Sequence, residues 1–209
     1  MIEYKDAILQ TPDTANHAPL TLHVEAGEMV GLRVPQSAWA TQMLLSMLGM
    51  APLAEGYASV DGEPVLPATA RLFRRRMAYV PVDLDMPFAR VADMAKSLFL
   101  LDAHGDVAFR KSQLMEAWRA LDIDPSYYDS SLQDVSRPVV QRMLVATCSL
   151  LQRPILLLDH PTSRQDAQQA DRVGVFLRRP PLDETTRLIA TDDEQLLARC
   201  DRVVALTDA

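Results

Sequence analysis

An uninterrupted apolar run that ends in an aspartate most restricts the folds open to this chain of 209 residues. The run reads Ile155-Leu156-Leu157-Leu158-Asp159 and shows no polar alternation. Such a segment is typical of a parallel strand whose two faces are both covered by helices. Helical patterns flank it, at residues 139–151 and 167–178. The sequence therefore predicts a right-handed, doubly wound α/β arrangement around a parallel sheet.

Short strands and helices fill the rest of the chain, and Thr, Pro, Asp, Asn and Gly residues separate them as turn signals. Because no linker-like stretch divides the chain, we expect one domain that spans residues 1–209. The expected strands cover residues 2–9, 20–24, 29–34, 57–60, 77–80, 187–190 and 203–206, and the expected helical stretches cover residues 39–50, 91–121 and 194–199.

The overall charge and the N-terminal segment argue against several classes of protein. A formal net charge of −7 argues against a general nucleic-acid binder. No apolar run approaches the roughly 18 residues of a membrane span, and the N-terminus lacks the basic and apolar regions of a secretion signal. We therefore expect a protein of the cytosol. Cys148 and Cys200 show no metal-ligand spacing and are expected to be reduced packing residues.

Two motifs at a characteristic separation carry a resemblance to a known family. The segment from Leu156 to Ser163 reads LLLDHPTS and is similar to the LLLDEPTS text around the Walker B strand of ATP-binding cassettes. Ser136 lies 23 residues before Asp159, where that family has its LSGGQ signature. The chain therefore resembles the ATP-binding cassette, or nucleotide-binding domain, of ABC transporters. The signature positions are Val135, Ser136, Arg137, Pro138 and Val139, and the Gln141-Arg142 pair that follows also matches.

The resemblance implies a fold with three parts. These are a P-loop NTPase-like parallel-sheet core, an N-terminal antiparallel β portion and a helical subdomain at about residues 87–150. The resemblance also places a phosphate-binding loop after the third strand. Its positions here are Pro35, Gln36, Ser37, Ala38, Trp39, Ala40 and Thr41.

This loop departs from the pattern that phosphate binding needs. Glycines let successive N–H groups point at the phosphates, a lysine reaches the β- and γ-phosphates, and a hydroxyl holds magnesium. Here Val34, Ser37 and Trp39 stand at the glycine positions, and Ala40 stands at the lysine position. Only Thr41 keeps the magnesium hydroxyl. The indole of Trp39 is expected either to occupy the phosphate cradle or to pack on a loop that no longer serves a ligand.

The resemblance marks further positions whose usual residues are replaced. Asp159 keeps the carboxylate that coordinates magnesium through water, so Asp159 and Thr41 are metal ligands only if magnesium ATP binds. His160 replaces the catalytic glutamate and Asp192 replaces the switch histidine, so no catalytic residue is expected. Val82 replaces the Q-loop glutamine. In the signature, arginine and proline replace both glycines, and the proline has no N–H to donate.

The resemblance also implies a partner surface beside the Q-loop, where the family receives a short helix of a transmembrane subunit. Val82, Met86 and Phe88 are the candidate docking residues. The competing interpretation is that these side chains pack the helical subdomain onto the core, since helix-spaced apolar residues usually do so. The apolar segment that holds them continues to Val91, Met94 and Leu98.

Together, these substitutions predict a cassette subunit that does not hydrolyse ATP and needs no cofactor, with weak ATP and magnesium binding left open. We expect a structural or regulatory component of a membrane transport complex, peripheral on the inner face of the cell membrane. The expected partners are a transmembrane permease and a second cassette subunit, and no nucleic acid. Two alternatives remain, so enzyme activity stays open: a weak ATPase that uses Asp159 and His160, and a soluble scaffold without a transporter partner.

Overall fold

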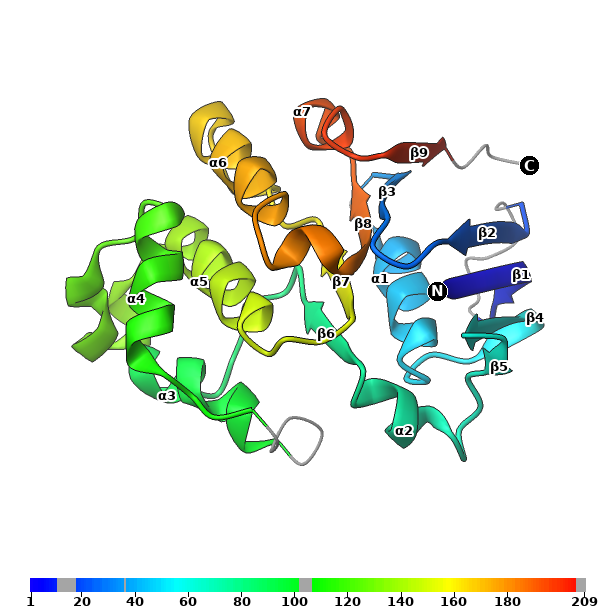
Figure 1. The fold of residues 1–209 in the computed structure, drawn as a ribbon, viewed down its shortest axis with the longest axis horizontal. Helices are drawn as coiled ribbons and strands as arrows, with labels where there is room; N and C mark the ends of the chain where they lie inside the picture. Colours follow the sequence, from blue (N-terminus) through cyan, green and yellow to red (C-terminus); the bar gives the residue numbers. More distant parts are fainter. Residues whose placement is uncertain (11–17, 36, 102–106, 206–209) are drawn as a thin grey trace.

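The computed structural model describes residues 1–10, 18–35, 37–101 and 107–205. A five-stranded parallel sheet occupies the middle of the molecule (Figure 1). A four-stranded antiparallel sheet lies on one side of it, and a group of helices lies on the other (Figure 1). These helices are α3 (Val91–Ser97), α4 (Lys111–Ala120) and α5 (Arg137–Ser149).

The parallel sheet has the strand order β6-β7-β8-β3-β9, and every neighbouring pair runs parallel. This confirms the predicted parallel core. Strand β7, which lies between β6 and β8, is buried at every position, which explains why it shows no polar alternation. The strands are β3 (Met29–Arg33), β6 (Met77–Val80), β7 (Ile155–Asp159), β8 (Thr186–Thr191) and β9 (Arg202–Ala205), and the helices packed near them are α1 (Ala38–Met47), α6 (Ala167–Leu177) and α7 (Glu194–Leu197).

The antiparallel sheet has the order β2-β1-β4-β5, which confirms the antiparallel β portion. Its buried face packs over α1, where the hydroxyl of Tyr4 donates a hydrogen bond of 2.6 Å to the carbonyl oxygen of Met43. Burial raises the pKa of Tyr4, so the hydroxyl remains a donor. The strands are β1 (Ile2–Leu9), β2 (Leu20–Val24), β4 (Leu53–Val60) and β5 (Glu63–Pro64).

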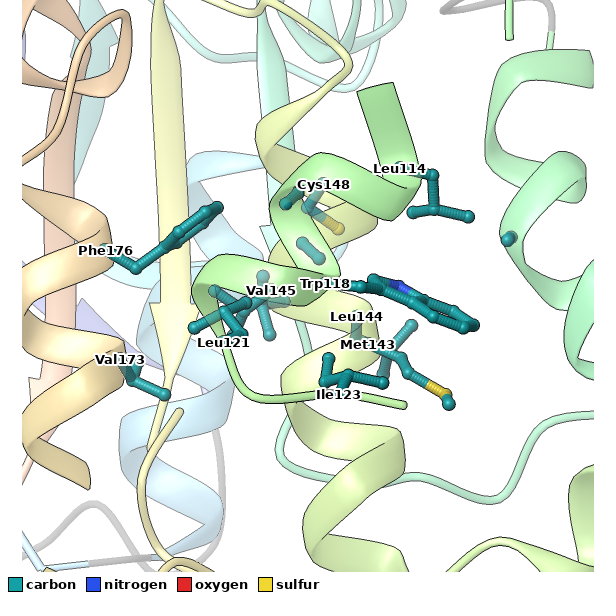
Figure 2. Packing of buried hydrophobic residues seen from close by; sticks show 14 of the residues in the cluster. Leu114, Trp118, Leu121, Ile123, Met143, Leu144, Val145, Cys148, Val173 and Phe176 are labelled. Atoms are coloured by element: carbon teal, nitrogen blue, oxygen red, sulfur yellow. The ribbon is translucent and has the colours of Figure 1, made fainter. Parts of the chain in front are cut away.

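The helices on the other side share a hydrophobic cluster with the parallel sheet. Figure 2 shows Trp118 of α4 beside Met143 and Leu144 of α5, and the same cluster includes Phe176 of α6 and Leu158 of β7. The helical portion is therefore packed directly onto the core of the sheet. Short 3₁₀ turns complete it, namely η2 (Leu98–Leu100), η3 (Pro125–Asp129) and η4 (Leu132–Asp134).

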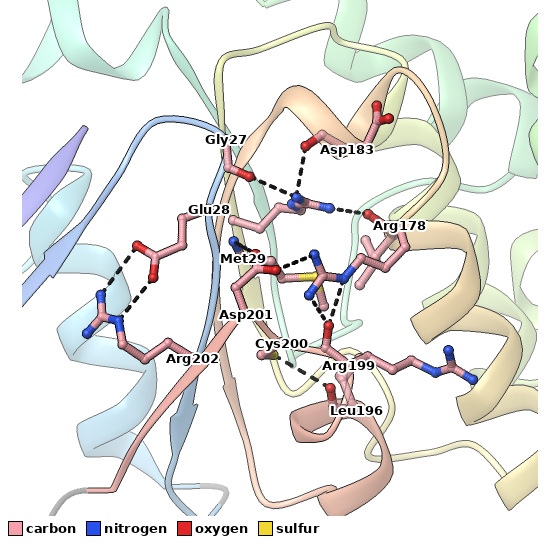
Figure 3. Close-up of polar contacts among 12 residues, drawn as sticks. Gly27, Glu28, Met29, Arg178, Asp183, Leu196, Arg199, Cys200, Asp201 and Arg202 are labelled. Carbon is pink, nitrogen blue, oxygen red and sulfur yellow. Dashed lines mark hydrogen bonds and ion pairs between the residues drawn. The ribbon is translucent and has the colours of Figure 1, made fainter.

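Polar contacts attach the outermost strand β9 to the sheet (Figure 3). The carboxylate of Asp201 accepts a hydrogen bond from the backbone N–H of Met29 at 2.8 Å and pairs with Arg178 at 2.8 Å. Arg202 pairs with Glu28 at 3.0 Å. These contacts join the turn before β9 to β3 and to the end of α6, and they hold the outer strand in register.

Candidate functional site

The carboxyl ends of β3, β6, β7 and β8 meet at one edge of the sheet, where the loops that carry the predicted site residues begin. Ligands of open parallel sheets bind at this edge. The loop after β3 leads into α1, and Ser37 caps that helix by accepting the N–H of Ala40 at 3.3 Å. One amide at the phosphate-loop position is thereby already engaged. Of the other predicted loop positions, Pro35 and Ala38 are exposed, Trp39 and Thr41 are half-buried, Ala40 is buried, and Gln36 lies outside the described residues.

Trp39 packs against the hydrophobic cluster beneath the antiparallel sheet and is half-buried. Of the two interpretations of this indole, the contact supports a packing residue on the loop. The first turn of α1 is thus held to the core by apolar contact at a position where phosphate binding requires a glycine.

Asp159, at the end of β7, is fully buried, and polar side chains lie within hydrogen-bond distance of both its carboxylate oxygens. The hydroxyl of Thr41 donates to Oδ2 at 2.6 Å, and the hydroxyl of Tyr79 donates to the same oxygen at 3.2 Å. Burial and the neighbouring Asp159 raise the pKa of Tyr79, so its hydroxyl keeps the proton that it donates. The two positions that could hold magnesium therefore lie together, as the motif spacing implies. Tyr79 is a member of this cluster that the sequence reasoning missed.

His160 stands next to Asp159 and is only 1% exposed. Its Nδ1 lies 2.8 Å from Oδ1 of Asp159, and its Nε2 lies 3.2 Å from the carbonyl oxygen of Val34. Both ring nitrogens thus face acceptors. Since a general base needs a free lone pair, this arrangement leaves His160 without a nitrogen open to a water molecule.

Acidic side chains follow β8. Asp192 is exposed, and Asp193 caps α7 while accepting the hydroxyl of Thr162 at 2.7 Å. Together with Glu194 they line a shallow cavity of about 330 Å³. A phosphate group beside these carboxylates would meet like charges, which is unfavourable.

The signature positions form the beginning of α5. Ser136 precedes the helix, and Pro138 lies in its first turn. Arg137 forms an exposed ion pair with Asp85 of the same chain. Val135 is buried and belongs to the core, whereas Val139 is half-buried. The arginine that replaces a signature glycine is therefore engaged within the chain.

The predicted docking segment forms one wall of a groove of about 590 Å³. Met86 and Phe88 line it and are half-buried, so both keep exposed surface. The sequence reasoning missed the opposite wall, because its residues follow more than 40 positions later in the chain. The lining consists of Leu84, Asp85, Met86, Pro87 and Phe88 on one side, and of Leu132, Gln133, Val135, Arg137 and Val140 on the other.

Four other residues of the expected docking surface do not line the groove, and one of them, Leu98, is half-buried against the core. Val91 and Met94 are 0% and 1% exposed, so the continuation of that surface into α3 was wrong: these side chains pack the helix onto the core. Val82 does not line the groove, but its carbonyl oxygen accepts a hydrogen bond from Arg164 at 3.4 Å.

The described residues, 1–10, 18–35, 37–101 and 107–205, contain neither a metal-binding cluster nor a membrane-spanning helix. Within those ranges, no group of three or more His, Cys, Asp or Glu side chains could hold a metal ion. Among the same residues, no helix has the length and apolar character to cross a bilayer. Cys148 and Cys200 are free thiols, and burial raises the pKa of Cys148 to about 12, in keeping with reduced packing residues.

The sequence has relatives among transport proteins. A family model described as ABC transporter matches residues 18–163, more than half of the chain. The glutathione/L-cysteine transport system ATP-binding/permease protein CydD of Haemophilus influenzae is 26% identical over 95% of this chain and 34% of its own length. The Nod factor export ATP-binding protein I of Sinorhizobium fredii is 32% identical over 90% of this chain and 54% of its own length. The chain thus spans between 34% and 54% of these two relatives.

Solved structures share the fold. The dimeric structure of MJ0796, described as a bacterial ABC transporter cassette, matches with a TM-score of 0.82 at 17% identity, covering 99% of this chain and 94% of that one. A bacterial Atm1-family ABC exporter with ATP bound matches with a TM-score of 0.80 at 18% identity, covering 99% of this chain and 37% of that one. The family match over more than half of the sequence shows that the chain belongs to the ABC transporter family, as an ATP-binding cassette domain.

Proposed function

We propose that this cassette is a structural or regulatory subunit of a membrane transport complex and does not hydrolyse ATP. The position of His160 is the observation that carries the proposal. A residue at this place must accept a proton from the attacking water, or polarise it, and for that it needs an open acceptor. The ring of His160 offers none, because its nitrogens lie against Asp159 and the carbonyl oxygen of Val34.

Missing phosphate contacts give further support. At the lysine position, Ala40 presents only a buried methyl group. A charged hydrogen bond contributes about 1.5–3 kcal/mol, so the loss of one such contact weakens binding by about 10- to 100-fold. The exposed Asp192 at the position of the switch histidine would add repulsion toward a phosphate group. Magnesium ATP is therefore a poor fit to these residues.

The isolated protein is expected to show neither magnesium-dependent ATP hydrolysis nor tight ATP binding. The reason is the combined loss of the lysine, the glutamate and the switch histidine at positions 40, 160 and 192. Calorimetric titration with ATP and magnesium should give no saturable heat at micromolar concentrations, and phosphate release should equal that of a buffer control. Micromolar affinity with phosphate release above the control would contradict the proposal and favour the weak ATPase.

The variant Ala40→Lys is a control for this measurement. It returns one cation to the loop but leaves His160 bonded to Asp159 and supplies no glutamate. Its phosphate release is therefore expected to stay at the level of the buffer. Turnover by this variant would mean that His160 can activate water.

We further propose that the groove between residues 84–88 and 132–140 receives an apolar segment of a transmembrane permease, which would hold the chain on the inner face of the cell membrane. The half-buried Met86 and Phe88 support this, because such side chains adapt to a partner and burying one contributes roughly 1.5–3 kcal/mol. CydD is described as an ATP-binding/permease protein, which supports a permease as the partner. A second cassette subunit remains a further candidate partner.

Replacing Met86 or Phe88 by aspartate is expected to reduce copurification with membrane subunits by at least about tenfold while leaving the fold intact. Each change removes apolar contact that contributes roughly 1.5–3 kcal/mol, yet both side chains already reach solvent in the free chain. Affinity purification from detergent-solubilised membranes measures the first effect, and thermal unfolding of the isolated variants measures the second.

Leu100→Asp provides the matched control for docking. Leu100 is 81% exposed and does not line the groove, so this variant should copurify like the wild type. Docking at the groove is refuted if both groove variants unfold or if both copurify at the wild-type level. A wild-type chain that brings down no membrane subunit would support the soluble scaffold instead.

A further inference from the structure

His160 bonds to four separate parts of the chain. Its ring nitrogens contact Asp159 of β7 and the carbonyl oxygen of Val34 after β3. Its backbone N–H donates to Ala190 of β8 at 2.8 Å, and its carbonyl oxygen accepts the side-chain amide of Gln141 in α5 at 3.0 Å. The backbone of His160 has a φ of 46°, a left-handed conformation that is uncommon outside glycine. Such a conformation persists only where the surrounding structure holds it.

Gln141 links His160 to the first turns of α5 through its side-chain amide. Its side chain is fully buried, and its Oε1 accepts a hydrogen bond of 2.8 Å from Nε2 of Gln165. The same Nε2 also donates to the carbonyl oxygen of Pro138 at 3.0 Å. Because rotation of these amides would leave buried polar atoms unpaired, the start of α5 is fixed to the loop after β7.

The start of α5 is also a wall of the groove, since Arg137 and Val140 line it. The opposite wall is tied to the same part of the molecule. Arg137 pairs with Asp85, and Arg164 donates to the carbonyl oxygen of Val82 at the beginning of the docking segment. Residues 160–165 and the start of α5 therefore hold both walls of the groove.

We propose that His160, Gln141 and Gln165 form a latch that fixes the shape of the groove without a nucleotide. His160 is a positioning residue in this latch, because it joins the loop after β3 to α5. The inference rests on the proposed function insofar as the groove is its docking site. It goes beyond that function by assigning a task to the residue that replaces the glutamate.

Hydrogen exchange of the isolated full chain without nucleotide tests the latch. In the variant His160→Ala, the backbone amides of Val140 and Gln141 at the start of α5 are expected to exchange at least about tenfold faster than in the wild type, as in a local opening. His23→Ala is the matched control, because His23 is an exposed residue of β2 that pairs with Glu25. Its groove amides should exchange at wild-type rates.

Gln165→Glu is a second variant, and it tests the latch if His160→Ala does not fold. Glutamate keeps an acceptor for Arg142, whose Nη1 lies 2.6 Å from Oε1 of Gln165, but it removes the donor that reaches Gln141 and Pro138. Faster exchange at the start of α5 supports the latch. Wild-type exchange of the groove amides in the folded variants overturns it. Because no nucleotide is present, this result is independent of whether the protein binds ATP.

Discussion

Replacing His160 by glutamate, the usual residue of ATP-hydrolysing cassettes, is expected to lower the free energy of unfolding by about 3–5 kcal/mol. His160 and Asp159 are 1% and 0% exposed, and their side chains meet at 2.8 Å. A glutamate would place a second acceptor against the carboxylate of Asp159 and would remove the ring nitrogen that lies 3.2 Å from the carbonyl oxygen of Val34. Removal of one partner from a buried polar pair is costly because the other partner stays unpaired.

Urea unfolding followed by circular dichroism measures this loss. The variant His160→Gln is the control, since its amide keeps a donor for one of the two acceptors and should lose only about 1–2 kcal/mol. If the variant His160→Glu has the same free energy of unfolding as the wild type, the polar contacts of the His160 ring do not stabilise the fold.

The sheet could be predicted where its strands have a clear pattern. β7 is apolar throughout and bounded by Pro154 and Asp159, and its observed limits are those that the sequence predicts. β4 begins at Leu53, four residues before the predicted start, because its first half is largely exposed and shows no apolar alternation. β5 and α2 (Ala70–Arg74) were missed, since two and five residues are too few for a periodic signal.

The candidate site could be predicted in its positions but not in its contacts. Motif spacing implies that Thr41 and Asp159 meet although they are far apart in sequence. In the structure, the hydroxyl oxygen of Thr41 lies 2.6 Å from Oδ2 of Asp159. The direction of the His160 ring could not be predicted. It depends on the left-handed backbone conformation of His160 and on the carbonyl oxygen of Val34. Both are features of the backbone, and no pattern of residue types in the sequence indicates them.

The contacts of the docking segment could not be predicted from the sequence either. Apolar residues at 86, 88, 91 and 94 have similar character, so the sequence alone left docking and core packing as alternatives. In the structure, Met86 and Phe88 belong to an irregular segment with exposed surface, whereas Val91 and Met94 face the core from α3. Burial, which depends on contacts with distant parts of the chain, separates the two groups.

Replacing Trp118 by alanine is also expected to lower the free energy of unfolding by about 3–5 kcal/mol. The indole is 0% exposed and packs near Tyr128, and Figure 2 shows it beside Met143 and Leu144. Within the described part of the chain its Nε1 has no hydrogen-bond partner. The loss therefore comes from apolar contact and from the cavity left behind, not from a broken hydrogen bond.

Thermal unfolding can show how far this loss extends through the molecule. Because Trp118 shares one cluster with Leu158 of β7 and Phe176 of α6, the helical portion and the sheet should unfold together, in one transition lowered by about 10 °C. Trp39→Ala is the control, since Trp39 is only half-buried and its loss should cost about 1 kcal/mol. Two separate transitions in Trp118→Ala would instead mean that the helical portion unfolds on its own, because a shared core must fail as a unit.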